Sequence, residues 1–522
     1  MAESRVANSL RNYGMNAVSH VASILLSFIG RTFFIKLLSI EYLGVNGLFS
    51  NILSLLSLAE LGVGTAITYM MYKPIAENDI RKVAAYNRLF KKIYNFVGIF
   101  VLICGLAFTP FIYNVIKEPP SISENLYIIY ILFVCNSAIS YFFTYKRSLL
   151  IAYQKEYVNS QNVVQFAIIK ESLLIVLLLL FRDFYVYLAA QILVTFASNL
   201  AISIKVNRLF PEVVKATPKR ISKDEIGTIV KNTAGMVCHK IGAVAVSGTS
   251  NIFISYFVGI ATVGIYSNYM LIVKCAQQVI GSGINSLTAS FGNLVAIGNL
   301  DDILRVFRRI YFINFVIAYV MAIMFYVLVA PFITVWIGSE YLLNITATLV
   351  IVVNTLFFNQ IRIPYQMVIN TYGLFWQIKW KSILEAALSI AFSFFFAAWL
   401  KWGITGILMA ALLSDVMTSL WWEPFVALKY GMKRPYSFFL KSFAGYFLVL
   451  SITIGVLTIL FDFTDKIVAN AWIQLFIHLL FAALLMLAVI VIVYRKTSEY
   501  IYAKNFSRGL IEKMVKNIKI RL

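Results

Sequence analysis

The chain has 522 residues, of which 61% are hydrophobic and only 13% are charged, and its mean hydropathy is +0.82. A soluble domain is about half apolar and about a quarter charged, so these values exclude a soluble protein and indicate an integral membrane protein. The formal net charge of +22 does not indicate nucleic-acid binding, because the basic residues lie in short loops between apolar segments.

Apolar segments of about 20 residues are long enough to cross a bilayer core as a helix. By this length we predict an all-α integral membrane protein with about 14 transmembrane helices. The first six spans are predicted at 12–38, 43–72, 90–115, 125–152, 160–181 and 184–209. The next six are predicted at 231–258, 262–296, 304–337, 343–371, 378–400 and 404–429, and two more follow at 437–461 and 470–494.

Lys and Arg residues are concentrated in alternate loops. The segment 73–92, the link 205–231 and the tail after residue 494 are basic. The loops on the other side carry mainly acids, which are Glu41, Glu118, Glu124, Asp183, Glu340, Asp462 and Asp465. The positive-inside rule therefore predicts that the basic loops and both termini are cytoplasmic.

The first half of the chain recurs in the second. Leu43-Gly44-Val45 corresponds to Val263-Gly264-Ile265, and Phe90-Lys91-Lys92-Ile93-Tyr94 corresponds to Phe307-Arg308-Arg309-Ile310-Tyr311. The separation drifts in one direction, as loop-length changes between two copies of one unit would make it do. Six spans per copy predict two parallel repeats, a transporter pattern with the substrate path between the halves.

The repeat divides the chain into five predicted parts. They are an N-terminal lobe at 1–210, a cytoplasmic linker at 211–230, a C-terminal lobe at 231–430, two extra helices at 431–495 and a basic cytoplasmic tail at 496–522.

Charged residues inside the spans are the main indication of function. A central Arg, Lys or Asp costs about 2.5–3.5 kcal/mol on insertion scales, so such residues usually face a bundle interior or a watery cavity. Most of them here are basic, which predicts an anionic ligand such as a phosphate. The predicted substrate-binding residues are Arg31, Lys240, Lys274, Arg147 and Arg362, the last two being repeat mates.

Several of these charges have alternative interpretations. Arg147 and Arg362 lie towards inner span ends, from which they could extend to lipid phosphates. Glu60 either neutralises Arg31 or takes part in ion coupling. Asp415, the second ion-coupling candidate, could instead pair with Glu385 in the second lobe.

Other classes of site are not indicated by the sequence. The four cysteines lie in apolar runs without CxxC spacing, so neither a disulfide framework nor a metal site is expected. A P-loop of the form GxxxxGK[ST] is absent, which argues against an ATPase. The predicted outer loops are short, which disfavours a membrane enzyme acting on lipid-linked sugars. We therefore expect neither an enzyme nor a bound cofactor.

At this point the chain resembles the Wzx-type polysaccharide flippases, from the superfamily that includes multidrug and toxin extruders and lipid II flippases. The resemblance spans about residues 8–495. It rests on the six-plus-six-plus-two spans, the Gly62-Val63-Gly64 near Glu60, the basic loop after the second span, and Arg147 and Arg362 in repeat positions.

The resemblance implies a bilobed, V-shaped transporter that works by alternating access, with Arg31, Lys240 and Lys274 lining a cationic cavity. The implied cargo is a polyprenyl-diphosphate-linked oligosaccharide, moved from the inner to the outer leaflet of a bacterial plasma membrane for capsule or other cell-surface polysaccharide. Whether transport is coupled to a H+ gradient, a Na+ gradient or the membrane potential is left open. Membrane lipids, a polysaccharide polymerase and glycosyltransferases are the implied partners. The main alternative is a multidrug or cation extruder of the same superfamily. A further alternative is a scaffold protein that transports nothing.

Overall fold

The computed structural model describes residues 5–57, 63–222, 225–227, 248–467, 470–505 and 508, and all regular elements among them are helices. Within these ranges, 10 helices are long and apolar enough to cross a membrane. They coincide with the third to sixth and the ninth to fourteenth predicted spans. The chain is therefore an all-helical, multi-pass membrane protein. The total of about 14 spans stays a prediction, because the first, second and eighth predicted spans are not among these ten and span 231–258 lies mostly outside the described residues.

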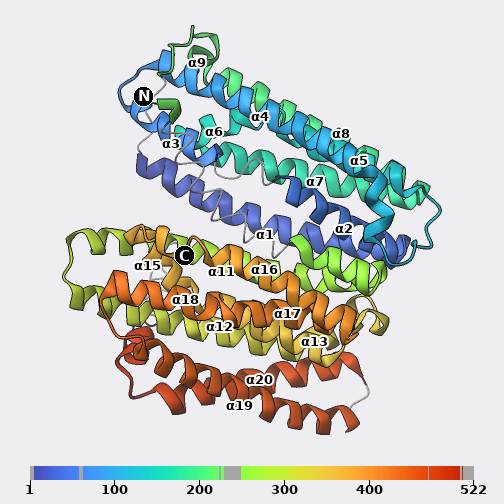
Figure 1. Cartoon of the computed structure of the whole chain (residues 1–522), viewed down its shortest axis with the longest axis vertical. Helices are drawn as coiled ribbons and strands as arrows, with labels where there is room; N and C mark the ends of the chain where they lie inside the picture. Colours follow the sequence, from blue (N-terminus) through green and yellow to red (C-terminus); the bar gives the residue numbers. More distant parts are fainter. Residues whose placement is uncertain are drawn as a thin grey trace, which may run out of the picture. The chain divides into compact units, whose positions relative to one another are not determined.

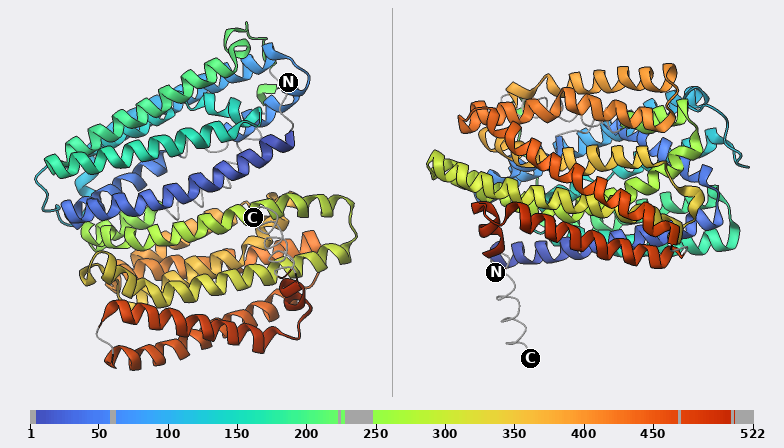
Figure 2. Two further views of the ribbon diagram at one scale, coloured as in Figure 1. Left: turned by 180° about the vertical axis from the view of Figure 1, so that it is seen from behind. Right: turned by 90° about the horizontal axis from the view of Figure 1, so that it is seen from below.

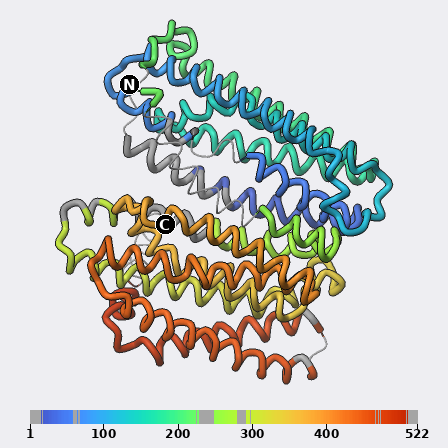
Figure 3. The backbone as a smooth tube through the Cα atoms, viewed as in Figure 1, coloured from blue at the N-terminus to red at the C-terminus, as the bar shows by residue number. Residues whose placement is uncertain are grey.

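The chain divides into two compact units, residues 1–268 and 269–522. The tube in Figure 3 traces the chain through both in sequence order. The division falls within helix α11 (Ile260–Ile297), later than the predicted start of the second lobe at 231. The predicted lobe boundaries themselves stay a prediction.

The first unit is a helical bundle in which α1 packs along α7, and α4 packs on α5 (Figure 1). Its elements are α1 (Arg5–Leu37), α2 (Ile40–Leu56), α3 (Val63–Ala76), α4 (Ile80–Phe108), η2 (Thr109–Val115), α5 (Leu126–Tyr141), α6 (Tyr145–Ala152), α7 (Glu156–Phe181), α8 (Phe184–Leu209) and α9 (Pro211–Lys215).

In the second unit, α19 and α20 lie together along α12, as both Figure 1 and Figure 2 show. Besides the rest of α11, its elements are α12 (Leu300–Trp336), η3 (Ser339–Tyr341), α13 (Ile345–Val350), η4 (Ile351–Phe358), α14 (Asn359–Ile361), α15 (Ile363–Tyr372), η5 (Trp376–Ile378), α16 (Lys381–Phe394), η6 (Phe395–Trp399), α17 (Gly403–Met417), α18 (Ser419–Val426), η7 (Ala427–Met432), α19 (Ser437–Ile467) and α20 (Ala471–Tyr494).

Asp and Asn side chains cap several helix starts. Asp79 accepts a hydrogen bond from the Lys82 amide at the start of α4, and Asp183 accepts one from the Val186 amide at the start of α8. Asn299 does the same for α12. These bonds satisfy amides that have no partner within the helix, which fixes where each span begins.

Two predicted spans are broken where buried charges lie. The span predicted at 125–152 is interrupted between α5 and α6, where Phe143 adopts a φ of 71°. The span predicted at 343–371 contains the π-helical segment η4. Irregular backbone at membrane depth is tolerated where it is buried in protein, and π-helical segments are frequent at functional sites.

A reciprocal contact joins the starts of α2 and α11 within the first unit. A Cβ added to Gly44 would clash with the backbone carbonyl of Ile260, and a Cβ added to Gly264 would lie 2.5 Å from the carbonyl of Ile40. Gly44 and Gly264 are the repeat mates found in the sequence. Both members of this sequence pair therefore lie where two backbones touch, which only glycine permits.

Candidate functional site

Arg147 is held in a polar cradle made entirely of neutral side chains. Its guanidinium donates to Oδ1 of Asn159 at 2.5 Å, of Asn199 at 3.0 Å and of Asn162 at 3.5 Å. The break before α6 positions the arginine against α7 and α8, which supply the asparagines. In the part of the chain that the structure describes, no carboxylate pairs with Arg147. The cradle therefore accepts hydrogen bonds from Nη1 and Nη2 but supplies no negative charge to balance the guanidinium.

Arg31 on α1 lies in a second polar site of the first unit. It donates to Ser267 Oγ at 2.8 Å and to Asn268 Oδ1 at 3.4 Å, both on α11. Glu171 on α7 interacts with it electrostatically. Glu171 also forms an ion pair with Lys170 at 3.1 Å, so the two adjacent charges on α7 are a local pair.

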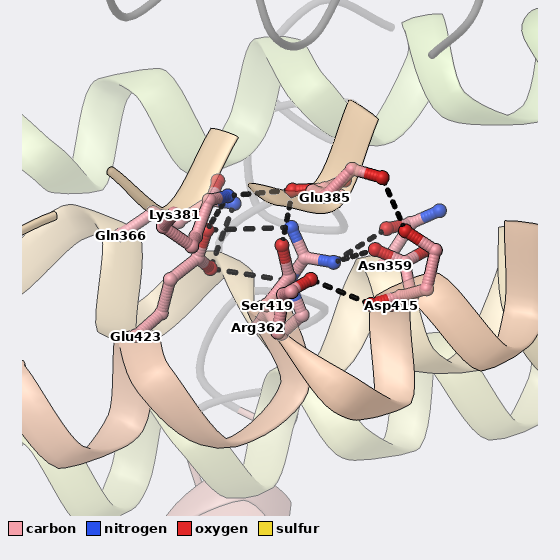
Figure 4. A network of polar contacts seen from close by, with 10 residues as sticks. Asn359, Arg362, Gln366, Lys381, Glu385, Asp415, Ser419 and Glu423 are labelled. Carbon is pink, nitrogen blue, oxygen red and sulfur yellow. Dashed lines mark hydrogen bonds and ion pairs between the residues drawn. The ribbon is translucent and has the colours of Figure 1, made fainter. Parts of the chain in front are cut away.

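Arg362 lies at the centre of a buried charge network in the second unit (Figure 4). Its guanidinium contacts Asp415 Oδ1 at 2.8 Å and Glu423 Oε2 at 3.1 Å. Lys381 contacts Glu423 at 2.7 Å and Glu385 at 3.2 Å. The side chain of Arg362 is only 6% exposed, which contradicts the alternative that it extends to lipid phosphates.

Neutral side chains complete this network. Gln366 donates to Glu423 at 3.1 Å, and Arg362 also donates to Asn359 at 3.0 Å. The Ser419 hydroxyl, on the first residue of α18, donates to Glu385 Oε2 at 2.5 Å. The interruption of the helix at Thr418 is what brings this serine to the carboxylate, because α17 ends one residue earlier.

The network contains two cations, Arg362 and Lys381, and three carboxyl groups. Two of these, Glu385 and Asp415, also interact with one another. Neighbouring buried carboxylates repel each other, and a proton shared between them removes that repulsion. With that proton the five groups sum to zero net charge, which suits a site buried among membrane helices.

Of the predicted site residues that the structure describes, Arg362 and Asp415 are the two that it brings into contact. Arg31 and Arg147 occupy separate sites of the first unit, and Lys274 is exposed on α11. Lys240 and Glu60 lie outside the described residues. The substrate and ion-coupling roles assigned to all of these residues stay predictions.

Glu423, Lys381 and the asparagine cradle were not predicted from the sequence. Lys381 and Glu385 are four residues apart, the spacing of an ion pair on one helix face, and this signal was available in the sequence. Glu423 follows Asp415 by eight residues, which places it near the same helix face. The asparagines carried no signal, because a neutral amide in an apolar span does not reveal its partner.

The chain matches a family of known proteins along more than half of its length. A family model described as polysaccharide biosynthesis protein matches residues 9–288. No curated protein sequence matches the chain.

Solved structures show the same fold at low sequence identity. The lipid II flippase MurJ matches with a TM-score of 0.64 and 13% identity, covering 94% of this chain and 99% of that one. A multidrug resistance MATE transporter of the MOP superfamily matches with a TM-score of 0.61 and 14% identity, covering 81% and 99%. A Vibrio cholerae MATE transporter matches with a TM-score of 0.57 and 13% identity, covering 83% and 99%. The chain therefore shares its fold with these solved structures, which are of a flippase and of transporters.

Proposed function

The chain belongs to the family of polysaccharide biosynthesis proteins, and on that premise we propose that it is a flippase for lipid-linked oligosaccharides. The cargo is a polyprenyl-diphosphate-linked repeat unit, which moves from the inner to the outer leaflet of a bacterial plasma membrane by alternating access. Both termini are cytoplasmic in this proposal. The protein releases the repeat unit at the outer leaflet, where the unit is assembled into cell-surface polysaccharide.

The observation that carries the proposal is the combination of this family with a transporter fold. Polysaccharide synthesis requires lipid-linked sugars to cross the membrane, and a family member with the fold of a transporter is suited to that step. The flippase structure covers 94% of the chain, whereas the two MATE structures cover 81% and 83%. This difference favours the flippase over the drug-extruder alternative at the level of architecture.

Uncompensated cations supply the expected recognition chemistry. Arg147 is a cation in a neutral cradle, and its planar donors suit a phosphate oxygen. Arg31, Lys240 and Lys274 remain the proposed cavity residues, with Arg147 and Arg362 as second candidates. Because two carboxylates balance the charge of Arg362, we propose that it stabilises the second unit in addition to its candidate role in substrate binding.

We further propose that the shared proton of Glu385 and Asp415 couples transport to a proton gradient. Losing the proton would leave three carboxylates against two cations, and the unbalanced charge would disfavour the packed arrangement of α16, α17 and α18. The charged groups that face the pair are Arg362, Lys381 and Glu423. Glu60 remains a second coupling candidate on the evidence of sequence alone.

Proteoliposomes test both proposals. The purified protein is reconstituted and presented with a polyprenyl-diphosphate oligosaccharide or with a fluorescent cationic dye. Sugar arriving on the opposite leaflet, without dye movement, supports the flippase, whereas dye extrusion alone supports the extruder. An Asp415→Asn variant should transport at a rate that no longer responds to an imposed pH gradient, while the exposed-carboxylate control Asp462→Asn should respond like the parent. A full response in Asp415→Asn rejects the coupling role.

A further inference from the structure

A pocket lined by arginines opens in the second unit where α12 begins. Its volume is about 440 Å³, and it is lined by Asp301, Leu304, Arg305, Arg308, Arg309, Arg434, Ser498 and Glu499. The lining therefore carries four arginines and two carboxylates. It lies on the side that the positive-inside rule predicts to be cytoplasmic.

Two of the four arginines already have carboxylate partners. Arg434 pairs with Asp301 at 3.0 Å, and Arg305 pairs with Asp302 at 3.1 Å. Both pairs are well exposed to solvent, so each contributes little and leaves its arginine free to exchange partners.

The other two arginines are oriented by aromatic rings. The Arg308 guanidinium lies 5.2 Å from the ring of Phe438, and that of Arg309 lies 4.0 Å from the ring of Tyr502. Among the described residues, no carboxylate forms an ion pair with either arginine. Stacking on a ring fixes the plane of a guanidinium and leaves the N–H donors at its edge free. These donors can then bind phosphate oxygens.

An unmet donor also lies in this pocket. The Nε of Arg434 is buried, and no acceptor for it is found in the described part of the chain. A buried N–H without an acceptor costs about 1–3 kcal/mol, so an anion that accepts from it would recover that energy.

An aromatic groove adjoins the arginine pocket and shares Arg308 and Glu499 with it. This groove has a volume of about 290 Å³ and runs between α12, α19 and α20. Its remaining walls are Tyr311, Phe312, Phe438, Ser442, Tyr446, Tyr494 and Thr497. A cationic pocket continuous with an aromatic groove matches a ligand that has a phosphate at one end and a hydrocarbon chain at the other.

We propose that the arginine pocket and the aromatic groove together form a binding site for a phosphate-bearing lipid. Arg308 and Arg309 hold the phosphate, Arg434 supplies the buried donor, and the first carbons of the chain lie along Tyr446 and Tyr494. Basic pockets between membrane helices on the cytoplasmic side are suited to anionic head groups. The site is separate from Arg31 and Arg147, and its existence does not depend on what the protein transports.

Native mass spectrometry of the full-length protein from nanodiscs tests this site. The probes are phosphatidylglycerol and phosphatidylcholine in nanodiscs, and inorganic diphosphate added to detergent-purified protein. The parent should retain one phosphatidylglycerol at low lipid excess and no phosphatidylcholine. The double variant Arg308→Gln/Arg309→Gln should bind phosphatidylglycerol about tenfold or more weakly, because two charge-assisted contacts are lost. The matched control Arg495→Gln/Lys496→Gln removes the same charge from exposed positions nearby and should bind like the parent.

A conservative variant guards against misfolding. Arg308→Lys/Arg309→Lys keeps the charge but loses the planar forks, so it should bind more weakly than the parent and more tightly than the Gln variant. Equal binding by the parent and both double variants would overturn the proposal. Diphosphate bound as tightly as phosphatidylglycerol would overturn the lipid assignment in favour of a soluble phosphate compound.

Discussion

Arg147 and Arg362 occupy corresponding positions of the repeat but have opposite electrostatic surroundings. Asparagines surround Arg147, whereas Asp415 and Glu423 pair with Arg362. Among the described residues, the first arginine therefore has no carboxylate counter-ion, whereas the second is part of a buried ion-pair network. Both arginines were predicted as site residues because they are charged residues within apolar spans. Most of their partners lie on other helices, and residue spacing along one helix does not reveal such partners.

Removing one carboxylate from the buried network should be costly. We expect Glu423→Gln to lower the free energy of unfolding by about 3–5 kcal/mol, because Arg362 and Lys381 would both lose a buried counter-ion. The change is measured as the loss of monodisperse protein on heating in detergent. Asp462→Asn breaks an exposed pair with Lys466 and should stay within about 0.5 kcal/mol of the parent. Equal stability of the two variants would show that the network contributes nothing.

The cradle around Arg147 should tolerate loss of the charge better than loss of the hydrogen bonds. Arg147→Gln keeps amide donors for the asparagines, so we expect folding to persist while transport falls. Arg147→Leu leaves buried asparagine oxygens without donors and should destabilise the protein by about 1–3 kcal/mol. The comparison is made by melting temperature beside transport rate. Undiminished transport by the Gln variant would remove Arg147 from the substrate site.

At the scale of elements, the contact between α2 and α11 depends on two glycines. Gly44→Ala places a methyl group against the Ile260 carbonyl, and the backbones must separate. We expect a loss of about 1–3 kcal/mol, as for overpacking of a core. Gly445→Ala in α19 meets nothing within 4 Å and should be neutral or slightly stabilising. If Gly44→Ala melted like Gly445→Ala, the close approach of these helices would be refuted.

The segment after α8 is attached to the start of α4 by charged groups. Lys82 pairs with Glu225 at 2.5 Å, and Lys219 pairs with Asp79 at 3.4 Å. The hydrogen bond from Lys82, helped by the Ser222 amide, lowers the pKa of Glu225 from 4.5 to about 2. A lowered pKa means that this contact is fully stabilising above pH 4.5 and is lost as the pH falls towards 2.

Hydrogen exchange of the linker tests this attachment. Glu225→Gln should raise exchange around residues 216–222 at neutral pH, in keeping with about 0.2–1 kcal/mol for an exposed pair. Compared as protection factors, which remove the intrinsic pH dependence of exchange, the parent should match the variant only as the pH falls from 4.5 towards 2. Asp183→Asn, which alters a helix cap at the other end of α8, should leave linker exchange unchanged. Protection of the linker that is independent of both pH and Glu225 would contradict the attachment.

At the scale of the whole molecule, hydropathy and length predicted the helices well, because a membrane span must satisfy its backbone internally and is therefore long and apolar. They did not predict the breaks at Phe143 and Thr418. The break at Thr418 places Ser419 against Glu385 on another helix, and hydropathy along one segment does not reveal such a contact. The sequence alignment matched Gly44 with Gly264. It could not show that Gly44 contacts the start of α11 and Gly264 the start of α2.

The central claim is that the chain moves a lipid-linked oligosaccharide across the bilayer. The most direct measurement is the rate at which the sugar of a polyprenyl-diphosphate oligosaccharide reaches the opposite leaflet of proteoliposomes. It compares the parent, the double variant Arg31→Gln/Arg147→Gln and empty liposomes. We predict transport by the parent, strongly reduced transport by a folded double variant, and none without protein. A parent no faster than empty liposomes, across several sugar head groups and with an imposed ion gradient, would contradict the account.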